Sequence, residues 1–234
     1  MCIIDKLFIK FGNHNKKFDF HYNIYGNNKN EAVMIFLGKG LKFRKEWKKY
    51  ADKFPEKTHI IITLSSKLLN PDPKKTKENY MKIIDKCDKL VKNYNVKKVV
   101  GFSLGNTFAC YFARKYKKIE KIVMIDPGDR LAELIWVSPL TQYIVKGAKE
   151  KGFSLKDFKK NLYEFDPVYN ILKMEKKSIF IIGGTGDNIL PYSHTKKLLK
   201  EISKSKSSIK ILIFPFVGHV LSTYLGLLFI NKKF

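Results

Sequence analysis

Short runs of apolar, largely β-branched residues alternate along the chain with longer segments in which apolar residues recur at helical spacing. The runs predict strands and cover residues 32–37, 58–64, 96–102, 121–125, 178–182 and 208–214. The run 32–37 is apolar at every position, which predicts a strand that is buried on both faces. Between and after the runs, the spacing predicts helices over 44–54, 77–94, 191–203 and 220–230. This order predicts an α/β protein with a mostly parallel central sheet of about eight strands and helices on both faces.

The N-terminal part of the sequence has a different pattern. Residues 3–9 and 18–25 form two strand-like runs that are joined through Gly12, and the second run alternates apolar and polar residues. Alternation of this kind predicts a strand with one solvated face. We therefore expect an antiparallel hairpin at the start of the sheet.

The segment 129–177 is too long to be a simple crossover between two strands. Its apolar residues predict a small helical cap that folds over the carboxyl edge of the sheet and supplies an apolar wall for a ligand. The expected pocket residues are Leu131, Leu134, Trp136 and Leu140. Because 234 residues suffice for one such domain and leave little room for a second, we expect residues 1–234 to form a single domain with this insertion.

Local signals place one helix inside this insertion. Ser154 and Asp157 have the spacing of a capping box, which marks the start of a helix. Asp166–Pro167 follows, and a proline is expected to end the helix that the capping box begins.

The formal net charge of +25 first suggests binding to nucleic acid or to an anionic membrane. Of the 46 basic residues, however, only Arg44, Arg114 and Arg130 are arginine. Proteins that read bases or clamp phosphates favour the bidentate guanidinium of arginine. The lysine excess therefore predicts a solvated surface and no specific nucleic-acid partner.

The three cysteines, Cys2, Cys87 and Cys110, have neither the spacing of a disulfide framework nor that of a metal site. Near the N-terminus Asp5 and Lys6 interrupt the apolar run that a signal peptide would need. The apolar run at 220–230 is shorter than the roughly 20 residues that span a bilayer. We expect a cytoplasmic protein with no membrane span, no metal and no disulfide.

The strongest chemical signal is Gly101-Phe102-Ser103-Leu104-Gly105, a G-x-S-x-G sequence between an expected strand and an expected helix. A serine at such a turn adopts a strained backbone conformation, and its neighbours two residues away must lack side chains. The sequence therefore predicts that Ser103 is presented as a nucleophile.

Two further residue types follow in the order that a serine nucleophile requires. Asp187 comes after the strand 178–182 in a glycine-rich loop, and His219 comes after the strand 208–214 and directly after a glycine. Ser, Asp and His at strand ends in this order are typical of one arrangement of the catalytic triad. His14, His21, His59 and His194 lack such a position and are expected to be surface or core residues.

On these residues the chain resembles the α/β-hydrolase superfamily over nearly its whole length. The resemblance implies an α/β-hydrolase fold and an oxyanion hole made of backbone N–H groups, which by position are those of Lys39 and Leu104. An ordinary glycine turn is the alternative interpretation of 38–41. Asp126, at the end of the strand 121–125, is a rival for the triad acid because it could also reach a histidine at this edge.

The triad predicts a serine hydrolase that cleaves a small-molecule carboxylic ester or thioester through an acyl-enzyme on Ser103, with no cofactor. An acyltransferase is an alternative, because transfer to an acceptor other than water uses the same acyl-enzyme. A second alternative, from a different class, is a non-catalytic protein with this fold that binds anionic surfaces, which the net charge favours.

Overall fold

The computed structural model describes residues 21–28, 30–38, 52 and 56–233. The expected strand 3–9, most of the expected helix 44–54, and Lys39 lie outside the described residues.

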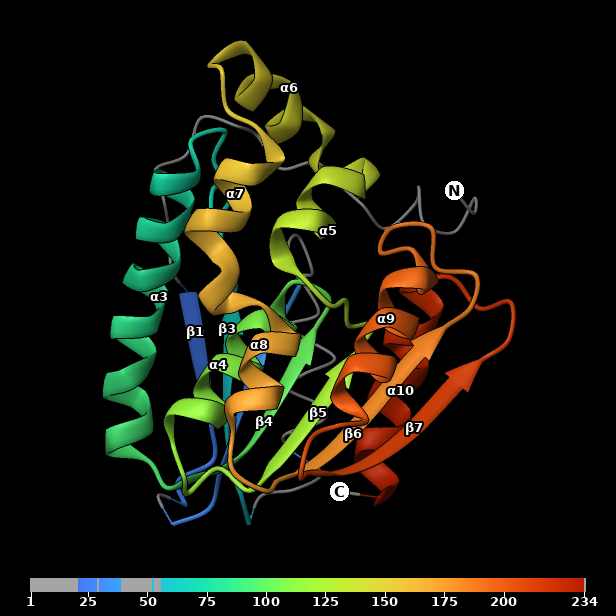
Figure 1. The fold of residues 1–234 in the computed structure, drawn as a ribbon. Coiled ribbons are helices and arrows are strands. Elements are labelled where there is room, and N and C mark those ends of the chain that lie inside the picture. Colours follow the sequence, from blue (N-terminus) through green and yellow to red (C-terminus); the bar gives the residue numbers. More distant parts are fainter. Residues whose placement is uncertain (1–20, 29, 39–51, 53–55, 234) are drawn as a thin grey trace.

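Seven strands form one sheet in the described part of the chain, in the spatial order β1-β3-β2-β4-β5-β6-β7 (Figure 1). They are β1 (His21–Tyr25), β2 (Ala32–Phe36), β3 (Thr58–Thr63), β4 (Val96–Phe102), β5 (Lys121–Ile125), β6 (Ser178–Gly184) and β7 (Ser208–Phe214). Strand β1 runs antiparallel to β3, and every other neighbouring pair is parallel. The expectation of a mostly parallel sheet is therefore confirmed.

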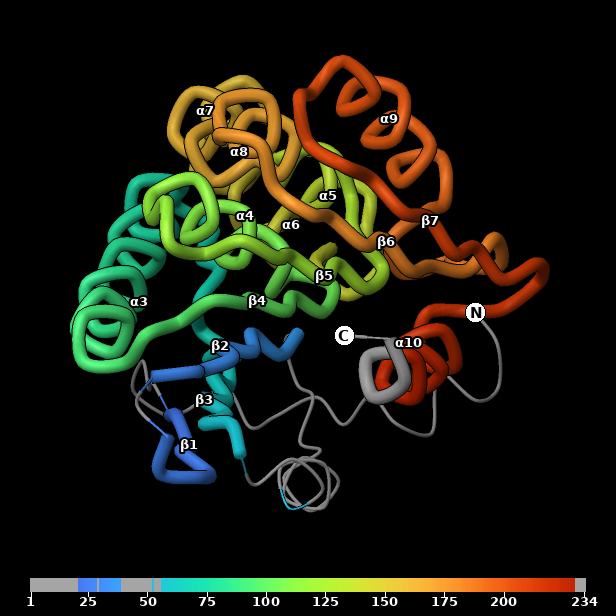
Figure 2. The backbone as a smooth tube through the Cα atoms, turned by 90° about the horizontal axis from the view of Figure 1, so that it is seen from below, coloured from blue at the N-terminus to red at the C-terminus, as the bar shows by residue number. Residues whose placement is uncertain are grey.

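Helices cover both faces of the sheet, as Figure 2 shows. One face carries α3 (Pro73–Asn93), α4 (Gly105–Lys115), α8 (Pro167–Lys173) and α9 (Tyr192–Ile202), and the opposite face carries α10 (His219–Lys233). Successive residues of a strand supply the two cores: Val99 packs into the cluster beneath α3 and α4, and Val100 packs into the cluster that includes Leu227 of α10. This is why the central strands carry apolar residues on both faces.

The insertion before β6 contains α5 (Leu131–Val137), α6 (Gln142–Glu150) and α7 (Leu155–Leu162), with short 3-10 turns at Pro139–Thr141 and Tyr163–Phe165. These three helices extend beyond the carboxyl edge of the sheet (Figure 1). The capping box of Ser154 and Asp157 is present at the start of α7, as expected. Pro167 does not end that helix. It begins α8, because the first turn of a helix needs no N–H from this residue.

The parallel strands end at one level. Phe102 at the end of β4 is opposite Ile125 at the end of β5, and Ile125 is opposite Ile182 in β6. Residues that follow these strands therefore gather at a common edge, which brings Ser103, Asp126 and the loop after β6 into one region. None of the helices within the described ranges is long and apolar enough to cross a membrane.

Candidate active site

Ser103 occupies the turn between β4 and α4 and has a positive φ of 51°. This left-handed conformation is uncommon for residues other than glycine, and it is the strained turn that the sequence predicts. The flanking glycines are required by close packing. A β-carbon on Gly105 would lie 2.2 Å from the carbonyl oxygen of Phe36, and one on Gly101 would lie 2.6 Å from the Cα of Asn106.

Hydrogen bonds to neighbouring backbone hold this turn in place. The N–H of Ser103 donates to the carbonyl of Ile125 over 2.9 Å. The side-chain amide of Asn106 donates to the carbonyl of Ser103 over 2.9 Å and to that of Ile125 over 2.8 Å. The serine is therefore fixed to the end of β5 as well as to its own strand.

Asp187 and His219 are in direct contact. The Oδ2 atom of Asp187 lies 2.6 Å from the Nδ1 atom of His219, and both side chains are largely buried. The other carboxylate oxygen, Oδ1, accepts hydrogen bonds of 2.8 Å from the N–H groups of Ile189 and Leu190. Asp187 is therefore oriented by its own loop, and it can hold the imidazole in the tautomer that carries the proton on Nδ1.

The glycine-rich loop after β6 makes this contact possible. A β-carbon on Gly184 would lie 2.1 Å from the carbonyl oxygen of Val217, in the segment that leads to His219. The N–H of Gly186 donates to the same carbonyl over 3.0 Å. Only a residue without a side chain permits this approach, so the glycines bring the chain before His219 against the loop that carries Asp187.

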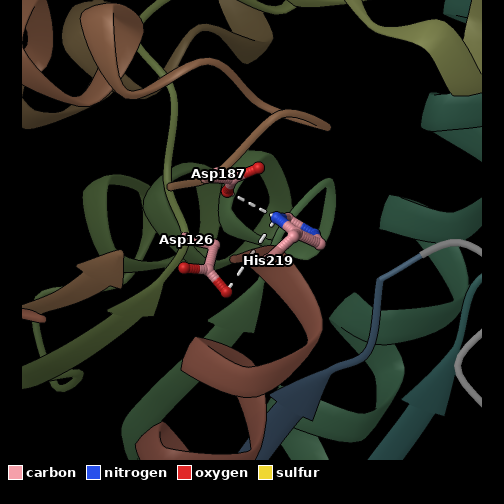
Figure 3. A group of neighbouring side chains, drawn as sticks. All are labelled: Asp126, Asp187 and His219. Atoms are coloured by element: carbon pink, nitrogen blue, oxygen red, sulfur yellow. Dashed lines mark hydrogen bonds and ion pairs between the residues drawn. The ribbon is translucent and has the colours of Figure 1, made fainter. Parts of the chain in front are cut away.

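Asp126 also faces His219, as Figure 3 shows. Its Oδ2 atom lies 4.0 Å from Nδ1 of His219. The carboxylate accepts a hydrogen bond of 2.6 Å from the hydroxyl of Ser222 and one of 2.9 Å from the hydroxyl of Thr223, both in α10. Burial raises the pKa of the Asp126 carboxyl to about 7, although a protonated His219 opposes this effect.

The structure thus brings Asp187, Asp126 and His219 into one cluster. Ser103 directly follows β4, and Asp126 directly follows the neighbouring strand β5. The sequence did not identify Ser222 and Thr223, which hold Asp126. The signal for them was present, since they are adjacent hydroxyl residues in the otherwise apolar segment 220–230.

Of the two residues expected to form the oxyanion hole, Leu104 and Lys39, only Leu104 lies within the described residues. Leu104 precedes α4, and within the described part of the chain its N–H makes no hydrogen bond. An unpaired N–H at the N-terminus of a helix can stabilise negative charge. Lys39, the other expected donor, lies outside the described residues.

The four expected pocket residues do not share one environment. Leu131 is completely buried in the main core, and Trp136 packs edge-on against Phe158 with ring centroids 5.0 Å apart. Leu134 and Leu140 belong to a small apolar cluster with Ile189 and Leu190, the residues that follow the Asp187 loop. We call these four residues, Leu134, Leu140, Ile189 and Leu190, the rim cluster.

Two groups among the described residues offer ligand atoms within 4.8 Å of one another: Asp126, Asp187 and His219, and separately Asp129, Glu133 and His194. In both groups the side chains already bond to other residues of the protein. In the first group Asp187 contacts His219, and Asp126 accepts from Ser222 and Thr223.

In the second group, Asp129 contacts His194 over 2.6 Å and Arg130 over 3.2 Å, and Glu133 pairs with Lys159 over 2.7 Å. Neighbouring cations already balance these carboxylates, so the donor set is that of an ion-pair network rather than a metal site.

No protein-family model matches the sequence, and no curated protein matches it. Solved structures do match. Acylaminoacyl peptidase from Pyrococcus horikoshii superposes with a TM-score of 0.64 at 13% identity, over 88% of this chain and 36% of that chain. Monoacylglycerol lipase from Paleococcus ferrophilus superposes with a TM-score of 0.55 at 15% identity, over 89% of this chain and 98% of that chain.

Bromoperoxidase from Bacillus anthracis is also similar, with a TM-score of 0.53 at 17% identity over 92% of this chain and 95% of that chain. The chain has the α/β-hydrolase fold. It spans little more than a third of the length of the peptidases that it matches, and nearly the whole length of the lipase and the bromoperoxidase. At these identities the similarity establishes the fold of this chain and leaves its chemistry to be argued from its residues.

Proposed function

We propose that this chain is a serine hydrolase that cleaves a carboxylic ester or thioester through an acyl-enzyme on Ser103. The observation that carries the proposal is the 2.6 Å contact between Asp187 and Nδ1 of His219, at the sheet edge where Ser103 has its strained turn. Solved structures with this fold include a peptidase and a lipase by their names, which agrees with acyl-transfer chemistry.

In the proposed first step the Ser103 hydroxyl oxygen attacks the carbonyl carbon of the substrate, and Nε2 of His219 takes the hydroxyl proton. Asp187 stabilises the imidazolium that forms. The negative charge that develops on the carbonyl oxygen is stabilised by the N–H of Leu104, with that of Lys39 proposed as its partner. The bond to the leaving group then breaks, and His219 gives its proton to the departing alkoxide or thiolate.

The second step releases the acyl group. Water attacks the acyl-enzyme and gives a proton to His219, and the proton then passes to the Ser103 oxygen as the carboxylic acid leaves. No cofactor takes part in either step. If an alcohol or a thiol replaces water here, the same site is an acyltransferase, which product analysis with added acceptors distinguishes.

The rim cluster supports an apolar acyl group as the bound part of the substrate. Its four aliphatic residues lie beside the loop that carries Asp187, and Leu140 is only partly buried. Apolar side chains next to a reacting group favour hydrocarbon over a charged ligand.

Labelling with a fluorophosphonate probe tests the proposal directly, because the probe reacts with an activated serine. We expect labelling of the wild-type chain and loss of labelling in Ser103→Ala. The matched control is Ser203→Ala, which removes an exposed hydroxyl at the end of α9 and is expected to leave labelling unchanged. Labelling that survives in Ser103→Ala would exclude Ser103 as the nucleophile.

A further inference from the structure

Two carboxylates face the same nitrogen of His219. Asp187 is within hydrogen-bonding distance of Nδ1, at 2.6 Å, and Asp126 lies 4.0 Å from the same atom (Figure 3). A single imidazole N–H can donate to only one carboxylate at a time. Asp126 is thus within ion-pairing distance of the histidine when the ring is protonated, and it is close enough to become its hydrogen-bond partner after a small movement of the ring.

The backbone of Asp126 has the same unusual conformation as that of Ser103. Its φ is 48°, and its N–H donates to the carbonyl of Ile182 over 2.8 Å. Left-handed residues other than glycine persist where the surroundings fix them, and they cluster at functional sites. The turn therefore fixes the direction in which the Asp126 carboxylate points.

Helix α10 holds this carboxylate and the histidine together. His219 is the first residue of α10, and Ser222 and Thr223, one turn later, donate to the two oxygens of Asp126. Two charged groups face Asp126: His219, at the start of α10, and Asp187, in the loop after β6. Asp187 repels a negative charge on Asp126, so of these two charged groups a protonated His219 is the one that favours it, together with the two hydroxyl hydrogen bonds.

A buried carboxylate of purely structural use is costly, since a neutral amide of the same shape could accept from one of these hydroxyls and donate to the oxygen of the other without the loss of charge solvation. The charge has a use in the step where His219 becomes an imidazolium. We propose that Asp126 is a second acid of this site, a positioning residue that stabilises the charged form of His219 alongside Asp187 and replaces Asp187 as its partner when Asp187 is lost. This inference rests on the proposed function.

A double-mutant cycle tests the proposal through kcat/KM on a neutral ester. The proteins are wild type, Asp126→Asn, Asp187→Ala and the double variant. Alanine at 187 leaves Nδ1 without a competing amide, so the ring can turn to Asp126. We expect Asp126→Asn to lower kcat/KM by less than about threefold in the wild-type background and by at least about thirtyfold in the Asp187→Ala background. The second factor lies within the roughly ten-thousand-fold loss that removal of a triad acid can cause. An equal factor in both backgrounds would overturn the proposal.

A second measurement does not depend on activity. The titration of His219 is followed by NMR through its C2 proton, assigned with His219→Gln. A facing carboxylate favours the imidazolium, so Asp126→Asn is expected to lower the titration midpoint of His219 by about half a pH unit or more. The control is Asp166→Asn, which changes a partly buried carboxyl that accepts from the N–H of Leu131 and does not contact His219, and it is expected to leave the midpoint unchanged.

The two measurements separate the two proposals. If wild type neither hydrolyses esters nor reacts with the fluorophosphonate probe, the proposed function fails, whereas the midpoint of His219 still tests its coupling to Asp126. If the double variant does not fold, the midpoint in the single variant Asp126→Asn decides, and an unchanged midpoint would overturn the role of Asp126.

Discussion

The side-chain amide of Asn106 donates to the carbonyl of Ile125 over 2.8 Å and so joins the first turn of α4 to the end of β5, directly before Asp126. The same amide also donates to the carbonyl of Ser103. The turn at Ser103 is therefore held by its backbone and by Asn106, and among the described residues the serine hydroxyl makes no hydrogen bond that holds it.

We first predict that Ser103→Ala loses essentially all ester hydrolysis, by a factor on the order of a million, as for loss of a triad nucleophile. The fold is expected to survive because the bonds that hold the turn remain. Steady-state kinetics and circular dichroism on the same preparation check this. Turnover close to wild type in a well-folded Ser103→Ala protein would remove Ser103 from the mechanism.

The second prediction ranks the two acids. Asp187→Asn should lower kcat by about ten-thousand-fold, because the new amide N–H faces Nδ1 of His219 and favours the wrong tautomer. Asp126→Asn should cost far less, since Asp187 keeps its 2.6 Å contact. Both substitutions preserve shape, so each serves as the control for the other. The reverse ranking would make Asp126 the primary acid.

The third prediction concerns the acyl group. On neutral esters kcat/KM should rise from acetate to about hexanoate, because each buried methylene contributes about 0.8 kcal/mol, or roughly fourfold. Leu140→Ser should flatten this rise by making the rim cluster more polar. Salt should have little effect, since exposed lysines are screened beyond about 8 Å at physiological ionic strength. A preference for acetate would contradict an apolar acyl pocket.

The fourth prediction concerns a buried hydrogen-bonded pair that joins the start of the segment 129–177 to α9. Asp129 is completely buried and lies 2.6 Å from Nδ1 of His194. His194→Leu removes the histidine and leaves a buried charge with less compensation, so the free energy of unfolding should fall by about 3–5 kcal/mol. Urea denaturation measures this. As a control, Lys97→Met breaks the exposed pair with Glu120 and should change stability little, and an equal loss in both variants would contradict the argument.

The fifth prediction concerns stability and pH. Burial raises the pKa of Asp166 to about 7, whereas an unfolded chain has an aspartate pKa of about 3.9. Between these values the folded state binds more protons than the unfolded state, so this group makes stability fall as pH rises. Asp166→Asn retains an oxygen that can accept from the N–H of Leu131 and abolishes the titration.

The variant should therefore gain stability relative to wild type as pH rises from about 4 to 7, by up to about 1.4 kcal/mol per pH unit. Urea denaturation at several pH values measures the difference. A difference that is constant over this range would show that Asp166 does not titrate in the folded chain as its burial implies.

The sequence predicted those features that depend on neighbours along the chain. The apolar runs located the strands, and the two glycines around Ser103 located the strained turn, because both signals are local. The choice between Asp187 and Asp126 could not be made in this way. It depends on the loop after β6 and on α10, which approach from segments distant in the sequence.

The pair of Asp129 and His194 could not be predicted for the same reason. The two residues are separated by 65 positions in the sequence, and neither has a local signal. The proline at 167 illustrates a different limit. A proline can end one helix or begin the next, and here the packing of α8 against α4 and α9 accompanies the second outcome.

Helix α10 carries His219 at its first residue and, through Ser222 and Thr223, also secures Asp126. It is the last helix among the described residues and packs on β5 and β6, where a β-carbon on Gly226 would lie 2.8 Å from the Cδ1 atom of Ile125. Catalysis in this protein would therefore report on the attachment of this one helix. On heating, enzymatic inactivation would precede the loss of the parallel sheet, and the interval between the two temperatures would measure how firmly α10 is docked.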